Sequence, residues 1–374
     1  MTTYSDTQSQ MPEGVSGPGD LLAAIPAFLG FTPHRSLVVI CLDDTAGGGP
    51  TIGMVMRHDL KLPEPVEDEH QLWGRVSAEM AKVTAHFAEI CARDDVRGAL
   101  ALIVDDRARP SERGTRADRH CRAVARRLAR DLRDRGTELA QVYLTAELVL
   151  GSRWWTAFGP AESGTIPDPT TSPVTLAYLL EGRGVHESRD KLAEAIEPVD
   201  TAVSRTVEEL LRSGRSRDRG SDRMRLDAIL SRLAMWAASS PDHPAVVALP
   251  TETIAEFGLA LRNVMVRDSL LAITLTGFAE LAEQLWSYLM RILPAPERAC
   301  PATLLGFSAY ARGEGALATL ALDIALDADP DYSLAQLLDR SLLAGARPAM
   351  IREVALSGYA VAELCGVRLP PPLE

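Results

Sequence analysis

The stretch from Asp20 to Pro63, DLLAAIPAFLGFTPHRSLVVICLDDTAGGGPTIGMVMRHDLKLP, constrains the fold more than any other part of the chain. Residues 36–42 and 51–56 are β-branched and aliphatic runs of strand length, separated by a glycine-rich loop whose backbone can take positive φ angles. This pattern predicts an antiparallel β-hairpin. Upstream, residues 21–29 are predicted to form a short helix that Gly30 ends.

Helical and strand patterns then alternate as far as residue 198. The segment GALALIV is wholly apolar and too short for an isolated helix, which favours a strand buried on both faces. We therefore predict an α/β domain over residues 20–198, with a mixed, partly parallel sheet and an initial β-hairpin. After the hairpin its predicted elements are helix 67–93, strand 98–104, helix 116–135, strands 140–150 and 153–158, and helices 174–181 and 188–196.

The second half of the chain has a different pattern. Residues 199–225 include the polar run SGRSRDRGSDR and are predicted to be a linker, and residues 226–374 show recurring helical periods that predict an all-α domain. Within it, residues 299–345 resemble one tetratricopeptide hairpin, on the basis of Leu305, Gly306, Tyr310, Ala318, Leu322, Ala325 and Pro330. Residues 1–19 are predicted to be a disordered tail.

Several segments also carry a resemblance to a known family. The opening LLAAIPAFLGFTPHRSLVVICL, then RWWTAF, ESRDKLAEAIEP and ARGEGALATLALDIALDADPDYSLAQLL, resemble an actinobacterial family known only as a domain of unknown function. The resemblance covers most of the chain and implies architecture and a cytoplasmic location, but no activity. It also implies a cysteine-rich segment after the tryptophan strand, where this chain has FGPAESGTIPDP instead.

Composition excludes some classes of function. The net charge of −12 makes nucleic acid an improbable partner and disfavours an anionic membrane. The five cysteines include no C-x-x-C pair, which indicates neither zinc site nor disulfide framework and fits the reducing cytoplasm. We find no motif for nucleotide, haem, zinc or flavin, and no uncharged apolar run near the roughly 20 residues that span a bilayer.

Charged side chains follow two of the predicted strands. Arg57, His58 and Asp59 end the second strand of the hairpin, and Asp105 and Asp106 follow the GALALIV strand. If these strands are parallel neighbours, the five residues share the carboxyl edge of the sheet, where open α/β sheets place ligands. Carboxylates with a histidine could bind a divalent cation or act as acid and base. Alternatively, these residues cap strand ends, as in most α/β domains.

The predicted helix at 116–135 has a basic outer face. Eleven arginines and four acidic residues between Arg107 and Arg135 give a local net charge of +7. Five of the arginines follow helical spacing on one face: Arg119, Arg122, Arg126, Arg130 and Arg133. Such a stripe indicates an anionic ligand or partner, and the alternative is a solvated helix face.

The adjacent Trp154 and Trp155 should point to opposite faces of a strand, so we expect at most one of them in the core. The other is a candidate platform for a ligand or partner.

Two hypotheses of function follow. The leading one is a cytoplasmic binding or regulatory (adaptor) protein, with an α/β domain that meets a ligand and a helical domain that binds another protein. The alternative is a metal-assisted hydrolase or phosphoryl-handling enzyme with its site at the carboxyl edge of the sheet. No catalytic motif in the sequence favours the second hypothesis.

Overall fold

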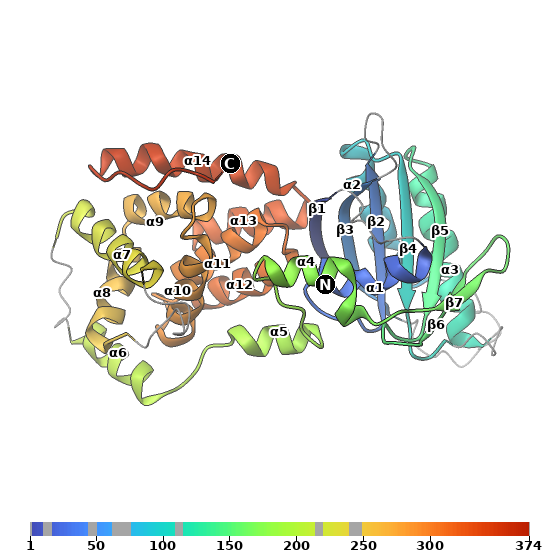
Figure 1. Ribbon diagram of the computed structural model, residues 1–374, viewed down its shortest axis with the longest axis horizontal. Coiled ribbons are helices and arrows are strands. Elements are labelled where there is room, and N and C mark those ends of the chain that lie inside the picture. The colour runs from blue at the N-terminus through green and yellow to red at the C-terminus, as the bar shows by residue number, and fades with distance from the viewer. Residues whose placement is uncertain are drawn as a thin grey trace. The chain divides into compact units, whose positions relative to one another are not determined.

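The computed structural model describes residues 2–9, 17–43, 51–61, 76–108, 115–213, 220–238 and 249–373 (Figure 1). The chain divides into two compact units, Met1–Leu192 and Ala193–Glu374. The first unit contains a mixed sheet with helices, and the described part of the second unit consists of helices and loops. The predicted fold class, an α/β domain followed by an all-α domain, is confirmed.

The first unit is built on a seven-stranded sheet with the order β1-β3-β2-β4-β5-β6-β7. Strands β4 and β5 pair in parallel, and the other neighbouring pairs are antiparallel. The predicted hairpin is confirmed, because β2 and β3 pair antiparallel. The strands are β1 (Thr2–Ser9), β2 (Ser36–Asp43), β3 (Thr51–Asp59), β4 (Gly98–Val104), β5 (Glu138–Thr145), β6 (Arg153–Thr156) and β7 (Ser163–Thr165).

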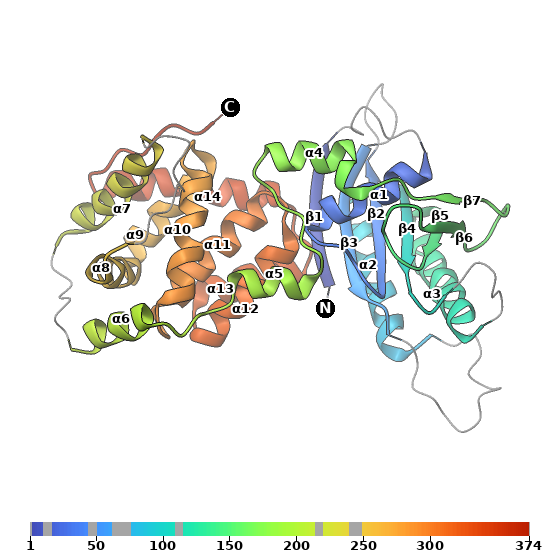
Figure 2. The same cartoon turned by 60° about the horizontal axis from the view of Figure 1, so that its bottom comes forward.

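Helices cover both faces of this sheet, with α2 and α3 packed together on one face and α1 and α4 on the other (Figure 2). The apolar strand β4 lies between the two layers, and four of its last five residues are fully buried, as its sequence predicts. Gly30 ends α1 in the left-handed conformation, with φ of 77°. The helices are α1 (Pro18–Leu29), α2 (Ala78–Arg93), α3 (Arg116–Arg133), the 3-10 helix η2 (Pro169–Thr171), α4 (Pro173–Leu180) and α5 (Arg189–Ile196).

Several boundaries differ from the sequence predictions: β5 ends at Thr145 and not at residue 150, and β6 ends at Thr156 and not at residue 158. In the segment predicted as a disordered tail, Thr2–Ser9 form β1, whose backbone pairs with β3. In the predicted linker at 199–225, residues 202–212 form a helix with Val207 fully buried, so this segment has its own packing contacts. The helix predicted at 67–93 begins at Ala78, and residues 62–75 lie outside the described ranges.

The described part of the second unit contains the end of α5, the helices α6 to α14 and the 3-10 helix η3. Its core includes Trp286, Phe307 and Leu322, all almost completely buried. Among the described helices of the whole chain, none has the length and apolarity of a bilayer span. The elements are α6 (Ala202–Arg212), α7 (Asp222–Ala237), α8 (Thr251–Leu261), α9 (Val264–Leu271), η3 (Ala272–Leu275), α10 (Ala279–Ile292), α11 (Ala299–Ala311), α12 (Gly315–Ala328), α13 (Ser333–Leu343) and α14 (Pro348–Leu364).

Helices α11 and α12 form the predicted helical hairpin. A Cβ atom at Gly306 would lie 3.0 Å from Cγ of Leu322, so the glycine lets the two helices approach closely. The Tyr310 hydroxyl donates a hydrogen bond of 2.8 Å to the carbonyl oxygen of Ala346, which ties α11 to the connection between α13 and α14. The tetratricopeptide-like character of this hairpin stays a prediction.

Candidate functional site

The residues predicted at the carboxyl edge of the sheet do lie at one edge, but not on neighbouring strands. Ser36, the first residue of β2, pairs with Asp59 of β3 on one side and with Val104 of β4 on the other. Strand β2 therefore separates β3 from β4 and runs antiparallel to both. The expectation that β3 and β4 are parallel neighbours is wrong. A hairpin pattern does not reveal which strand pairs with the other side of β2.

The carboxylates at this edge are engaged by arginines. Asp105 is fully buried and accepts hydrogen bonds from the backbone N–H of Arg107 and from its guanidinium, at 3.1 Å from N and 2.6 Å from Nε. Asp106 accepts two hydrogen bonds from the Arg35 guanidinium, at 2.7 and 3.0 Å, and these hydrogen bonds lower the pKa of Asp106. Asp59 lies 2.6 Å from Nη2 of Arg57. We call the ion-paired side chains at this edge the edge cluster.

Arg57 and His58 are themselves buried parts of that cluster. The Arg57 side chain is 4% exposed, its Nε donates to Oγ of Ser36 at 2.9 Å, and its guanidinium carbon lies 5.5 Å from the centre of the Phe31 ring. Burial lowers the pKa of both Arg57 and His58. Among the described residues, no group of three or more His, Cys, Asp and Glu side chains is arranged to bind a metal ion.

Burial of His58 leads to a test by pH. Because its folded-state pKa lies below the usual 6.5, the unfolded chain binds more protons as the pH falls through 6.5. The contribution of His58 to stability is thus complete above pH 6.5 and is lost as the pH falls through the lowered pKa. Urea unfolding between pH 7.5 and 5, at about half-unit steps, should show a shallower decline for His58→Gln than for wild type. Equal slopes would contradict this prediction.

Trp154 and Trp155 are both buried, 7% and 3% exposed, so the expectation that at most one is core is wrong. Trp154 packs edge-on against Tyr143, with ring centroids 5.5 Å apart. A Cβ atom at Gly164 would lie only 2.9 Å from its ring, so a glycine opposite Trp154 makes room for it. Neither indole is therefore exposed enough to serve as a platform for a ligand or partner, which sequence alternation alone does not show.

Helix α3 has the amphipathic character predicted for it. Thr115 caps its first turn by accepting a hydrogen bond from the backbone N–H of Asp118 at 3.2 Å. Its buried face includes Cys121, Val124, Leu128 and Leu132. Two acidic residues on this helix each bind the arginine one turn away: Asp118 with Arg122 at 3.0 Å, and Asp131 with Arg127 at 2.8 Å.

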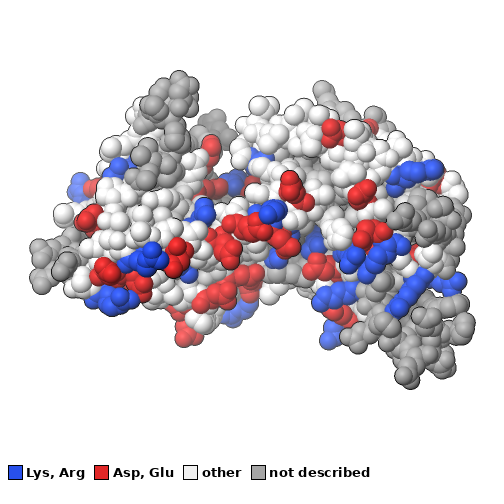
Figure 3. Space-filling model, turned by 90° about the horizontal axis from the view of Figure 1, so that it is seen from below, with Lys and Arg blue, Asp and Glu red and all other residues white. Residues whose placement is uncertain are grey.

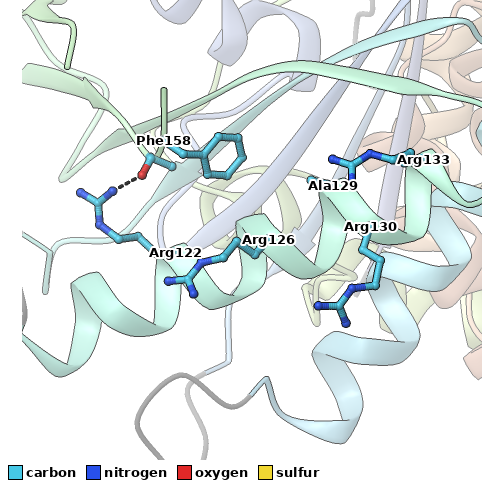
Figure 4. Close-up of a pocket in the computed structure, with 7 residues that line it drawn as sticks. Arg122, Arg126, Ala129, Arg130, Arg133 and Phe158 are labelled. Carbon is cyan, nitrogen blue, oxygen red and sulfur yellow. Dashed lines mark hydrogen bonds between the residues drawn. The ribbon is translucent and has the colours of Figure 1, made fainter. Parts of the chain in front are cut away.

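The outer face of α3 borders a groove of about 510 Å³, which we call the arginine groove. Its lining residues come from α3 and from the two residues that follow β6 (Figure 4): Arg122, Arg126, Ala129, Arg130, Arg133, Ala157 and Phe158. Four of the five arginines of the predicted stripe therefore line one hollow. The fifth, Arg119, is half-exposed and is not among the lining residues.

The four arginines of the groove divide into two kinds. Arg122 binds Asp118 and donates to the carbonyl oxygen of Ala157, so it joins α3 to the segment that carries Phe158. Arg126, Arg130 and Arg133 are exposed, and their guanidinium groups have no hydrogen bond or ion pair with the described part of the chain. Three positive charges on one and a half to two turns thus remain available to a ligand.

The sequence did not identify the other half of the groove. Phe158 follows β6 and is partly exposed beside α3, and Ala129 and Ala157 contribute only small side chains. Figure 4 shows the Phe158 ring beside the helix between the positions of Arg122 and Arg133. No pattern in the sequence marks this position, because Phe158 follows four consecutive buried residues, 154–157, and not an alternating run.

The groove lies in a unit whose surface charge is mixed. On the face shown in Figure 3, basic side chains are prominent on the right, over the first unit, with acidic side chains interspersed. The chain as a whole carries a net charge of −12. A site for a negatively charged ligand must therefore act over short distances, close to the Debye length of about 8 Å at physiological salt.

Fold and groove define a two-unit protein in which an α/β unit carries an arginine-lined site and a helical unit follows. The chain belongs to the family described as Domain of unknown function (DUF4192), which matches over residues 18–349. The match begins at the start of α1 and ends in α14, so it includes most of both units. No curated protein and no solved structure matches the sequence. The predicted membership of a family known only as a domain of unknown function is thereby confirmed.

Proposed function

We propose that this chain is a binding or regulatory protein that recognises an anionic ligand in the arginine groove. The observation that carries the proposal is the set of three exposed guanidinium groups, on Arg126, Arg130 and Arg133, that line one hollow without an acidic partner among the described residues. Like charges three and four residues apart destabilise a helix by a few tenths of a kcal/mol per pair. A bound anion would remove that repulsion and form charge-assisted hydrogen bonds.

The helical unit carries the second part of the proposal, a surface for another protein. Several large apolar side chains on its helices are exposed, among them Leu337 of α13 and Met350 and Val354 of α14. Met350 and Val354 are four residues apart and lie on one face of α14, an arrangement suited to a partner helix. A cytoplasmic adaptor would use the two units for different partners, a ligand and a protein.

The hypothesis of a metal-assisted hydrolase receives less support from the edge of the sheet. A carboxylate that binds a catalytic cation needs free oxygen lone pairs facing a cavity. Asp105 and Asp106 direct theirs to Arg107 and Arg35. These ion pairs fit the alternative explanation, in which charged side chains at strand ends stabilise the loops.

Calorimetry with inorganic pyrophosphate tests the groove directly. We expect wild type to bind pyrophosphate in a salt-sensitive way, and Arg126→Gln/Arg130→Gln/Arg133→Gln to bind at least tenfold more weakly, because each charge-assisted hydrogen bond contributes about 1.5–3 kcal/mol. The matched control replaces Arg153, Arg205 and Arg212 by Gln, which removes equal charge from exposed positions outside the groove. Absence of salt-sensitive binding by wild type, or equal losses in both triple variants, would refute the proposal.

Stability of the groove variant separates ligand binding from folding. Gln has nearly the helix propensity of Arg, and the substitutions remove like charges at three- and four-residue spacing. The melting temperature of Arg126→Gln/Arg130→Gln/Arg133→Gln should therefore equal or slightly exceed that of wild type. Circular dichroism at 222 nm measures it. A fall of several degrees would show that these arginines stabilise the fold through contacts of their own.

A further inference from the structure

The spacing of the free arginines restricts the size of the ligand. Arg126 and Arg133 are seven residues apart on α3, which corresponds to about 10 Å along the helix axis at 1.5 Å per residue. Three guanidinium groups within that length match two or three adjacent anionic groups. A long polyanion would extend beyond them and meet the field of a chain with a net charge of −12. The groove therefore suits a compact, highly charged ligand.

The chemistry of the arginines favours phosphate. The planar guanidinium presents paired N–H donors that match phosphate oxygens in a bidentate geometry, and it keeps its charge at any physiological pH. Arg126, Arg130 and Arg133 all have these donors free of described partners. Two neighbouring phosphates can each be bound by one or two of these side chains.

The aromatic side chain in the same groove indicates what else the ligand carries. Phe158 is partly exposed beside α3, and the hydrogen bond from Arg122 to the Ala157 carbonyl holds its backbone there (Figure 4). Ala129 and Ala157 leave space next to the ring because their side chains end at Cβ. A planar heterocycle can stack on an exposed aromatic ring, as bases do on aromatic residues of nucleotide-binding proteins. The volume of about 510 Å³ is within the range of small-molecule sites.

We propose that the arginine groove binds a nucleoside diphosphate or triphosphate, with the base stacked on Phe158 and the phosphates bound by Arg126, Arg130 and Arg133. This inference rests on the proposed function, since it specifies the anion that the groove recognises. Arg122 acts as a positioning residue that fixes the segment with Phe158 relative to α3. The site requires no glycine-rich loop, because guanidinium groups replace backbone N–H donors at the phosphates.

The test compares ligands that differ only in the base. Calorimetry in magnesium-free buffer at about 0.05 M salt would measure the affinities of ADP, GDP and UDP. The reference ligand is methyl diphosphate, which has the same two phosphates and no base. We expect at least one nucleoside diphosphate to bind about tenfold more tightly than methyl diphosphate, the gain typical of one stacked base. Phe158→Leu should abolish that gain and leave the affinity for methyl diphosphate unchanged. Phe158→Tyr, which keeps the ring, should retain it.

The outcomes separate this inference from the proposed function. If methyl diphosphate and pyrophosphate bind but no nucleotide binds more tightly, the inference is overturned and the anion site stands. The same holds if Phe158→Leu weakens all ligands equally, because the ring would then serve the fold of the groove. If wild type binds neither pyrophosphate nor any nucleotide, both proposals fail.

Discussion

Replacing Asp105 with asparagine should lower the free energy of unfolding by about 3 kcal/mol. The carboxylate is fully buried and accepts hydrogen bonds from the backbone and the guanidinium of Arg107, whose side chain is only 29% exposed. Asparagine keeps the shape but removes the negative charge, so the Arg107 guanidinium is left half-buried without its counter-ion. Urea unfolding measures the loss as a lower midpoint with an unchanged slope.

Asp106→Asn is the matched control for that substitution. Asp106 is the next residue and also binds an arginine, but it and Arg35 are 41% and 47% exposed. Ion pairs with that much exposure typically contribute less than about 1 kcal/mol. If Asp105→Asn were as mild as Asp106→Asn, Asp105 would not have the structural role that its burial indicates, and the catalytic hypothesis for this edge would gain support.

Gly358→Val should destabilise the helical unit by about 3 kcal/mol. Gly358 lies inside α14 where that helix crosses α9 and η3, and a Cβ atom there would be 2.8 Å from the Asp268 carbonyl oxygen and 2.9 Å from the Ala272 nitrogen. Both are backbone atoms, so the helices must separate to admit a side chain. The better helix propensity of valine than glycine offsets only a few tenths of a kcal/mol. Thermal unfolding followed at 222 nm gives the change.

Gly277→Val controls for the substitution itself. A Cβ atom at Gly277, in the turn before α10, would meet no heavy atom within 4 Å. The melting temperature of Gly277→Val should therefore remain close to that of wild type. Similar losses at both positions would show that the contact between α14 and α9 is not the reason why a glycine is needed at Gly358.

Local patterns were sufficient to predict most elements of the fold. The β2–β3 hairpin, the buried strand β4 and the helices of the second unit all have apolar spacing that a single segment displays. The position of β2 between β3 and β4 could not be predicted, because strand order depends on pairing between segments about 60 residues apart. Strand β1 was missed because TTYSDTQS has no apolar alternation, and its pairing with β3 uses backbone groups.

The candidate site, too, could be predicted only in part. The sequence shows the basic stripe of α3, but it does not show which of these arginines are free. An Asp–Arg pair at four-residue spacing marks Arg122 as engaged, and a second pair engages Arg127. That rule alone does not single out the free arginines, because Asp134 stands four residues after Arg130 and yet no ion pair joins the two in the described structure. Phe158 comes from a distant part of the chain, so its position in the groove depends on how β6 packs beside α3.

The position of β1 has a consequence for solubility. Strand β3 carries the apolar sequence IGMVM, and within the sheet β1 occupies the side of β3 that β2 leaves open. An uncovered apolar strand is a template for pairing between molecules, which leads to aggregation. The segment that ends the sheet instead, TTYSDTQS, is polar and includes a charged aspartate. Residues 2–9 thus give this side of the sheet a polar edge in place of an apolar one, which disfavours edge-to-edge pairing between separate copies of the chain.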